Sequence, residues 1–203
     1  MSENQPVVVI IDDDPDIRNA LQGLLETIDL PTALFATALE FLGSRRPQRP
    51  CCIVVDVRLP GLSGLDFQQE LARENIAIPV IFITGHGDIP MSVRAMKAGA
   101  VEFLTKPLRD QELLDAIQAA LRRDRARVQD ERQVADLRTR HEELTARERQ
   151  VLALLVAGRV NKQIAAEIAI SEVTVRLHRG QIMRKMRASS LADLIRIADK
   201  IKL

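Results

Sequence analysis

The sequence predicts a doubly wound α/β domain of about 120 residues, joined by a helical linker to a small all-α domain. In the first part, short apolar runs alternate with amphipathic stretches, and some runs, such as VVVII and VIFIT, are apolar throughout. Strands of that kind suit a parallel sheet covered on both faces. In the second part no glycine or proline occurs between Arg109 and Gly158, which favours helix.

Five short strands are expected, each bounded by Asp, Pro or Gly, at residues 7–11, 32–35, 51–55, 80–84 and 102–104. Between them apolar residues recur at helical spacing. The resulting order, βαβαβαβαβα, predicts a five-stranded parallel sheet with helices on both sides.

The segment 122–140 is crowded with Arg, Asp, Glu and Gln. We expect a solvated helical spacer, because its apolar residues are too loosely spaced for a strong coiled coil. A flexible charged linker is the alternative. The domains are therefore predicted at residues 1–121, 122–140 and 141–203.

The last 60 residues predict four short helices. Thr145 begins a capping box with Glu148, and Gly158 is placed to end that first helix. A second helix follows at once, Ser171 is a good N-cap for the third, and Ser190 for the fourth. Two short helices joined by a tight turn are typical of a helix-turn-helix.

The net charge of +1 hides an asymmetry between the two halves. Residues 1–120 hold 10 basic and 17 acidic residues, giving −7, whereas residues 121–203 hold 19 and 11, giving +8. A basic half indicates a nucleic-acid or other acidic partner. All five Phe lie in the acidic half, so the basic half has no aromatic platform for stacking single-stranded bases.

Composition excludes several classes of protein. With 46% hydrophobic and 28% charged residues the chain is not disordered. It has no apolar run of about 18 residues and no secretion signal at its N-terminus, so we expect a cytoplasmic protein without a membrane partner. The two cysteines, Cys51 and Cys52, are adjacent and so form no ordinary disulfide framework, and they are too few for a cysteine zinc site.

Polar side chains follow the predicted strands where each strand ends. Asp12 and Asp13 follow the first strand, Asp56 the third, Thr84 ends the fourth, and Lys106 follows the fifth. These ends meet at one edge of a parallel sheet, where ligands bind. Clustered carboxylates favour a hard divalent cation, so we expect Mg²⁺.

This set of residues suits phosphoryl transfer to a carboxylate. Asp56 would be the nucleophile, and Asp12 and Asp13 would hold Mg²⁺ directly or through water. Lys106 would pair with the phosphoryl oxygens and Thr84 would hydrogen-bond one of them. Taken singly, a strand-end Asp is most often a turn residue or a helix cap, as we expect for Asp14 or Asp16.

The motifs IIDDDPDIR, VVDVRLPGLSG and FITGHGDIPMSVRAMKAGAVEFLTKP resemble the receiver domain of bacterial two-component response regulators, a flavodoxin-like fold. The resemblance implies that Asp56 accepts a phosphoryl group from a sensor histidine kinase. It implies that Asp13, Asp56 and the Arg58 carbonyl bind Mg²⁺, with Asp12 completing the pocket. The only catalysis it implies is self-phosphorylation and slow self-dephosphorylation at Asp56.

The resemblance also implies a switch. Thr84 moves toward the phosphoryl group and Phe103 follows, which reshapes the face through which receivers commonly dimerise. The sequence GHGD from Gly85 to Asp88 is similar to the loop of the FixJ branch. We interpret His86 as a loop residue that shapes the switch rather than as a catalytic group.

The third helix of the basic half has two different faces. Val175, His178, Ile182 and Met186 should pack inward. The other side chains are candidates for contacts to base edges and phosphates of duplex DNA; together with one residue of the preceding helix they are Lys162, Thr174, Arg176, Leu177, Arg179, Gln181, Arg184 and Lys185. The alternative is that these are merely solvated charges.

The segment LTARERQVLALLVAGRVNKQIAAEIAISEVTVRLHRGQIMRKM resembles the LuxR-type helix-turn-helix, and with the receiver it is similar to the FixJ/NarL family of transcription regulators. That implies a double-stranded operator, a homodimer formed on phosphorylation, and contact with RNA polymerase. Gly180 departs from the family, where many members carry a polar or basic residue, so operator preference is not carried over.

Two rival functions are kept open. One is a phosphohydrolase with an aspartyl-phosphate intermediate, like the haloacid-dehalogenase-like enzymes, for which Asp12 and Asp14 nominally form the D-x-D motif. The chain lacks the substrate-capping insertion of those enzymes, and such an activity would give the basic domain no role. The other is a constitutive DNA-binding regulator whose receiver does not switch.

Overall fold

The computed structural model describes residues 5–47 and 49–203. By its internal contacts the chain divides into two compact units, Met1–Val128 and Gln129–Leu203. Each unit is described by itself below.

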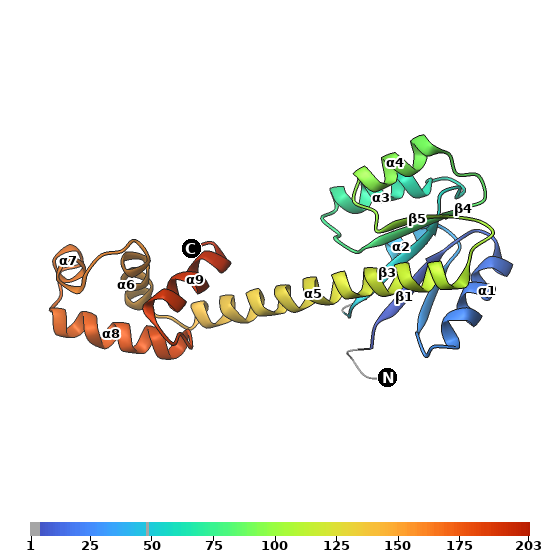
Figure 1. Ribbon diagram of the computed structural model, residues 1–203. Helices are drawn as coiled ribbons and strands as arrows, with labels where there is room; N and C mark the ends of the chain where they lie inside the picture. The colour runs from blue at the N-terminus through green and yellow to red at the C-terminus, as the bar shows by residue number, and fades with distance from the viewer. Residues whose placement is uncertain (1–4, 48) are drawn as a thin grey trace. The chain divides into compact units, whose positions relative to one another are not determined.

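The first unit contains the predicted five-stranded parallel sheet (Figure 1). Its strands, in the spatial order β2-β1-β3-β4-β5, are β1 (Val7–Ile11), β2 (Thr32–Phe35), β3 (Cys51–Asp56), β4 (Val80–Thr84) and β5 (Glu102–Thr105). Two of these boundaries differ slightly from prediction. β3 and β5 each extend one residue further, because Asp56 pairs with Ile83 and Thr105 with Thr84 in the parallel ladder.

Helices cover both faces of this sheet, as the continuous apolar strands predict. On one face α1 (Pro15–Glu26) and α5 (Asp110–Glu142) pack against Val8 and Ile10 of β1. On the other face Val9 and Ile11 belong to a core shared with α2 (Ala38–Gly43), α3 (Gly64–Arg73) and α4 (Ile89–Lys97). The alternation of side chains along β1 thus divides the apolar interior into two layers.

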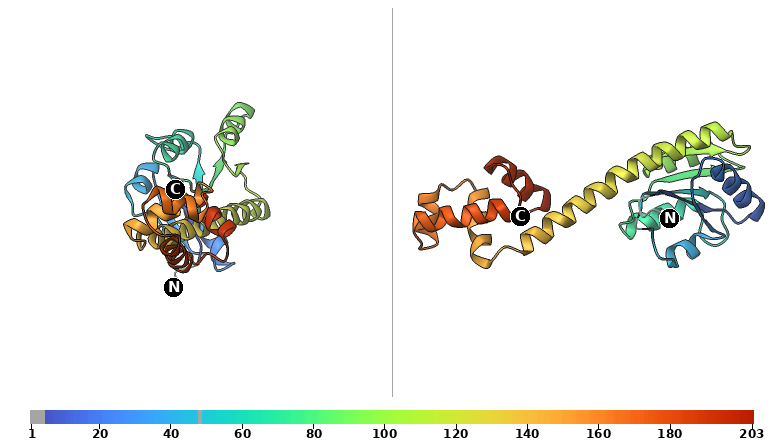
Figure 2. Two further views of the ribbon diagram at one scale, coloured as in Figure 1. Left: turned by 90° about the vertical axis from the view of Figure 1, so that its left-hand side faces the viewer. Right: turned by 90° about the horizontal axis from the view of Figure 1, so that it is seen from below.

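The helix α5 runs without interruption from Asp110 to Glu142, so the segment 122–140 is helical rather than a flexible linker (Figures 1 and 2). Most of this segment is exposed, as expected of a solvated spacer, but two positions are buried. Asp124 is fully buried and accepts a hydrogen bond of 2.8 Å from the backbone N–H of Cys51, at the start of β3. Leu137 is buried in the core of the second unit.

None of the helices in the described part of the chain has the length and apolar character of a membrane span.

The second unit contains four further helices, α6 (Ala146–Val156), α7 (Asn161–Glu167), α8 (Glu172–Lys185) and α9 (Leu191–Ile201). The predicted caps are confirmed. Thr145 and Glu148 form a reciprocal capping box, and Ser171 and Ser190 accept hydrogen bonds from the first turns of α8 and α9. Gly158 has a φ of 77°, a left-handed conformation that suits glycine after a helix end.

Candidate functional sites

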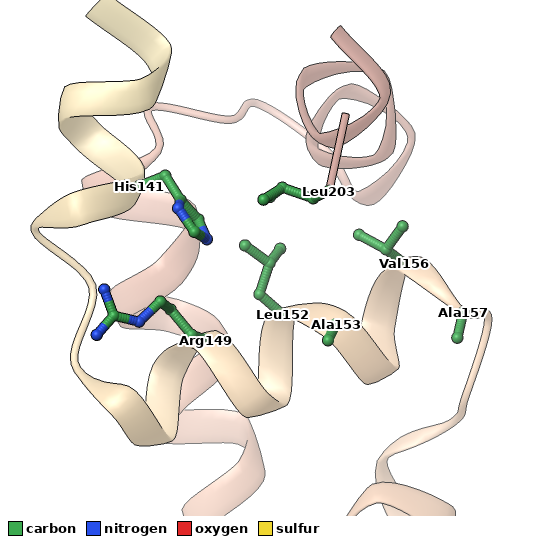
Figure 3. Close-up of a pocket in the computed structure, with 7 residues that line it drawn as sticks. All are labelled: His141, Arg149, Leu152, Ala153, Val156, Ala157 and Leu203. Carbon is green, nitrogen blue, oxygen red and sulfur yellow. The ribbon is translucent and has the colours of Figure 1, made fainter. Parts of the chain in front are cut away.

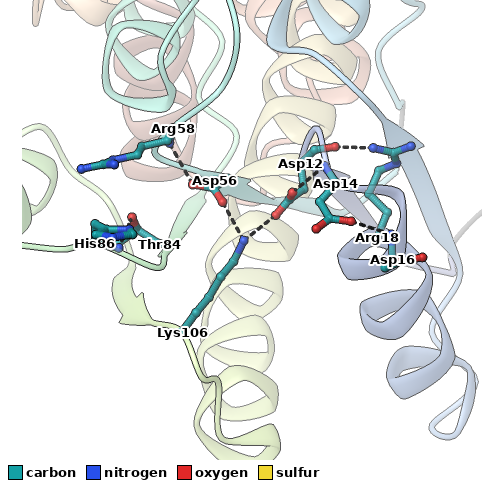
Figure 4. Close-up of polar contacts among 9 residues, drawn as sticks. All are labelled: Asp12, Asp14, Asp16, Arg18, Asp56, Arg58, Thr84, His86 and Lys106. Atoms are coloured by element: carbon teal, nitrogen blue, oxygen red, sulfur yellow. Dashed lines mark hydrogen bonds and ion pairs between the residues drawn. The ribbon is translucent and has the colours of Figure 1, made fainter.

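The carboxyl edge of the sheet brings together the polar residues that end the strands (Figure 4). Asp12 follows β1, Asp56 ends β3, and Lys106 follows β5. The Lys106 ammonium lies between the two carboxylates, with Nζ 2.8 Å from Asp12 Oδ2 and 2.6 Å from Asp56 Oδ2. Residues that are 94 and 50 positions apart in the chain are therefore joined in one network.

Backbone hydrogen bonds fix the orientation of both carboxylates. Asp12 Oδ1 accepts from the N–H of Asp14 at 3.0 Å, and Asp56 Oδ1 accepts from the N–H of Arg58 at 2.8 Å. Arg18 donates to the backbone carbonyl of Asp12 at 2.5 Å. Asp14 itself caps α1, as expected for one of the neighbouring acids. The pocket is therefore preorganised by the loops that follow β1 and β3.

Burial and ion pairing act against each other in this pocket. Asp12 and Asp56 are buried, at 1% and 7% exposure. Burial raises the pKa of Asp12, and the hydrogen bonds from Lys106 and Asp14 only partly offset it. For Lys106 burial acts to lower the pKa, but the hydrogen bonds that its ammonium donates to Asp12 and Asp56 outweigh burial, and the pKa is raised. Two buried carboxylates thus share one ammonium, and a further cation would be stabilised here.

The predicted Mg²⁺ ligands are only partly gathered. Asp12 and Asp56 share the pocket and Arg58 lies two residues after Asp56. Asp13, by contrast, is exposed and outside this hydrogen-bond network. Over residues 5–47 and 49–203, no three His, Cys, Asp or Glu side chains come together as a metal-holding group. The donors nevertheless fit Mg²⁺ in kind, because buried carboxylate oxygens with uncompensated charge are what that cation prefers.

The predicted switch residues lie beside the pocket. Thr84 is fully buried, and its hydroxyl accepts a hydrogen bond of 3.3 Å from the N–H of His86. Phe103 is half-buried and its ring lies 6.2 Å from that of Phe82. Figure 4 shows His86 next to Thr84, which agrees with a role in shaping this loop.

The sequence analysis missed two glycines that hold this site together. A Cβ atom on Gly87 would lie 2.9 Å from the Phe103 ring and 3.0 Å from Thr84 Cγ2, so only glycine lets the loop close over both. A Cβ atom on Gly64 would lie 2.4 Å from the backbone oxygen of Asp56. Their place in the GHGD and LPGLSG motifs was the available signal, but the close contacts depend on loop paths that periodicity does not reveal.

In the second unit, α8 has the two faces that its spacing predicts. Val175, Ile182 and Met186 are fully buried, and His178 is half-buried. Most of the predicted nucleic-acid contacts are exposed or half-buried, namely Lys162, Thr174, Arg176, Leu177, Arg179, Gln181 and Arg184. The arrangement provides an exposed helix face that carries basic and amide side chains.

Lys185 is a predicted nucleic-acid contact whose side chain instead forms an ion pair within the domain. Its ammonium donates to Glu148 Oε2 at 2.7 Å and to the Glu143 carbonyl at 3.1 Å. Burial acts to raise the pKa of Glu148, but hydrogen bonds from Lys185 and Thr145 outweigh it and the pKa lies below its usual value. Because Glu148 is buried by its part in the capping box, it needs this cation, and Lys185 is used within the domain.

A pocket of about 400 Å³ lies beside α6 (Figure 3). Its walls are apolar except for two basic side chains, and its lining is His141, Arg149, Leu152, Ala153, Val156, Ala157 and Leu203. It includes none of the predicted site residues.

Two family models match the chain. The model described as response regulator receiver domain matches residues 8–118. The model described as bacterial regulatory proteins, luxR family, matches residues 142–198.

Curated relatives match over almost the whole chain. Nodulation protein W of Bradyrhizobium diazoefficiens is 53% identical over 98% of this chain and 88% of its own length. Response regulator protein TodT of Pseudomonas putida is 46% identical over 100% of this chain and 89% of its own length. Among solved structures, response regulator StyR has a TM-score of 0.84 at 46% identity, covering 97% of this chain and 99% of its own. Full-length FixJ from B. japonicum has a TM-score of 0.56 at 37% identity, covering 98% of both chains.

Proposed function

Since the chain belongs to the DNA-binding response regulators of two-component systems, with a receiver domain and a LuxR-family domain, we propose that phosphorylation of Asp56 controls its binding to an operator. The observation that carries this proposal is the Lys106 ammonium between the carboxylates of Asp12 and Asp56. In this position it neutralises the acceptor before transfer and pairs with phosphoryl oxygens after it.

The transfer itself needs little from the protein beyond positioning. A carboxylate oxygen of Asp56 attacks the phosphorus of a phosphohistidine on the kinase, the P–N bond breaks, and the imidazole takes up a proton. Arg58 N–H holds one Asp56 oxygen and Lys106 the other. The catalysis that we assign to this chain is confined to its own Asp56.

Asp12, Asp13, Asp56 and the Arg58 carbonyl are the groups that would hold Mg²⁺. When bound, the ion neutralises charge on the phosphoryl oxygens and on the acidic pocket. The buried, undercompensated carboxylates of Asp12 and Asp56 support this assignment.

Dimerisation is proposed as the consequence of phosphorylation. Thr84 would hydrogen-bond a phosphoryl oxygen, and Phe103 would follow it inward. Ile89, Val93 and Met96 of α4 are 79%, 45% and 43% exposed and recur at helical spacing, which supports an apolar contact surface on that helix. We expect a monomer without phosphoryl mimic and a dimer with Mg²⁺ and beryllofluoride, measured by light scattering after size exclusion.

The exposed residues of α8 and Lys162 are proposed to contact duplex DNA, with paired α8 helices reading two half-sites. We leave Lys185 out of this set because its ammonium pairs with Glu148. Recruitment of RNA polymerase completes the proposal as the step by which a bound regulator changes transcription.

The acceptor is tested by phosphate incorporation from acetyl phosphate with Mg²⁺. The wild-type chain should incorporate one phosphoryl group as acetate leaves, and Asp56→Asn should incorporate none. Asp16→Asn is the matched control, since Asp16 is exposed in the first turn of α1. Equal incorporation by Asp56→Asn and the wild type would show that Asp56 is not the acceptor.

A further inference from the structure

Two large apolar side chains stand in solvent on α8. Val173 is 57% exposed and Leu177 is 65% exposed, one helical turn apart. The core on the opposite side of the helix is complete without them, since Val175 and Ile182 are fully buried. Nothing in the packing of the domain therefore accounts for two exposed aliphatic side chains at this spacing.

Gly180 continues the same face. It lies three residues after Leu177 and four before Arg184, so the four positions Val173, Leu177, Gly180 and Arg184 form one stripe along α8. A Cβ atom on Gly180 would meet nothing within 4 Å, and its φ is not in the left-handed region. Glycine is unfavourable inside a helix, and neither backbone conformation nor close packing within the chain requires it here.

From these observations, and resting on the operator binding proposed above, we infer that this stripe reads thymine. Val173, Leu177 and the bare backbone at Gly180 form an apolar notch that receives the 5-methyl groups of two thymines in the major groove. Among the four bases, thymine alone presents a methyl group there. The missing side chain at Gly180 lets the backbone come close to a base edge.

The spacing of the two side chains fits this assignment. Four residues of helix rise about 6 Å, and stacked base pairs are about 3.4 Å apart. A helix lying along the groove therefore places Val173 and Leu177 over methyl groups about two base-pair steps apart.

The charges around the notch favour DNA over an apolar protein partner. Arg176, Gln181 and Arg184 are exposed beside it, and a duplex offers phosphates and polar base edges to such side chains. Arg184 donates to Gln181 Oε1 at 2.5 Å, which holds both side chains at the border of the notch.

The test replaces thymine by deoxyuridine, which differs only by the methyl group. The full chain, with and without Mg²⁺ and beryllofluoride, first selects its preferred duplex from a randomised pool. Single substitutions are then made at every thymine of one half-site, and affinities are measured. Two positions about two steps apart should each lose about fourfold in affinity, the value of one buried methyl-sized group. Unchanged affinity at every position would overturn the inference. The proposed function would be unaffected by that result, because selection of a preferred sequence supports operator binding. Selection of no sequence under either condition would overturn both.

Two substitutions with matched controls assign the effect to the notch. Leu177→Ala should abolish the difference between thymine and deoxyuridine at one of the two positions and keep it at the other. Leu39→Ala, on a leucine of the receiver that is 61% exposed, should keep both. A Leu177→Ala chain that still distinguishes thymine at both positions would overturn the role of Leu177.

Gly180→Ala separates folding from recognition. It should raise the melting temperature, because alanine favours helix, and yet weaken duplex binding, because the added methyl fills the notch. Gly23→Ala, at an exposed helical glycine of α1 that also has nothing within 4 Å of its Cβ direction, should raise stability and leave binding unchanged. Unchanged or tighter binding by Gly180→Ala would overturn the role of Gly180.

Discussion

The pocket at the end of the receiver sheet is closed, whereas the outer face of α8 is open to solvent. Asp12, Asp56 and Thr84 are at most 7% exposed and are linked to partners within the chain, while Val173 and Leu177 are more than half exposed. A reaction at a carboxylate requires charged groups that are fixed in position before the substrate binds, and contacts within the fold fix them. Reading DNA needs side chains that the fold does not use.

This contrast has a consequence for substitutions. A change in the pocket alters stability and chemistry together, because the same hydrogen bonds serve both. Removing an exposed side chain from the outer face of α8 should alter binding and leave stability unchanged. The substitutions below compare side chains that the fold uses with side chains that it leaves exposed, beginning with the largest expected loss of free energy.

Lys106→Ala should cost about 3 kcal/mol of stability at pH 7 without divalent cations, because it leaves two buried carboxylates without their ammonium. Added Mg²⁺ should restore part of that loss. Urea unfolding followed by far-ultraviolet circular dichroism measures it, since the chain has no Trp. The control Lys97→Ala, at an exposed lysine of α4, should change stability by less than about 0.5 kcal/mol. Equal stability of both variants would contradict a charge-coupled pocket.

Asp124→Ala should cost about 2 kcal/mol, because it strands the buried N–H of Cys51 at the start of the strand that carries Asp56. Asp130→Ala on the same helix removes an ion pair with Lys200 whose acid is 62% exposed, and should cost about 0.5 kcal/mol or less. The pair of urea titrations compares a buried with an exposed acid of α5. Similar losses in the two variants would argue against Asp124 as an anchor of that helix to the sheet.

Lys162→Ala should weaken duplex binding by about 1 kcal/mol and leave stability unchanged, as expected for an exposed phosphate contact. The slope of log affinity against log salt should fall by about one, with the preferred sequence unchanged. Fluorescence anisotropy at several salt concentrations measures it. A lost sequence preference with an unchanged slope would instead place Lys162 on a base.

The Glu148–Lys185 pair should make α6 and α8 sensitive to acid. The pKa of Glu148 is lowered in the folded chain, so its contribution is present above its ordinary value of 4.5 and is lost as pH falls through the lower folded pKa. Hydrogen exchange of peptides from α6 and α8 should accelerate below pH 4.5 beyond the intrinsic trend, and less so in Glu148→Gln. Parallel pH profiles of exchange for the wild type and Glu148→Gln would show that Lys185 does not stabilise the charged form of Glu148.

Much of the receiver pocket could be predicted from the sequence, because apolar strands that end in polar residues place those residues at one edge of a parallel sheet. Asp12, Asp56, Thr84 and Lys106 all lie where that rule puts them. Asp13 differs because it is exposed and outside the network. Nothing in a run of three Asp indicates which of them is buried.

The remaining differences between prediction and structure share one physical cause, which is that they depend on contacts between residues that are distant in the chain. Asp124 lies in a run of charged residues typical of a solvated helix, yet it meets Cys51. Lys185 has the spacing of a DNA contact, yet Glu148 lies within reach. Gly87 has no room for a side chain, because a Cβ atom there would lie 2.9 Å from the Phe103 ring. Periodicity along one element carries no information about such partners.

We propose that the acidic pocket controls the exposed face of α8, and the affinity of the full chain for duplex DNA is the measurement that decides it. With Mg²⁺ and beryllofluoride the wild-type chain should bind its selected duplex at least about tenfold more tightly than without them, within the usual range for coupled sites. Asp56→Asn should bind equally under both conditions. An unchanged affinity of the wild-type chain would contradict the claim and indicate a regulator whose receiver does not switch.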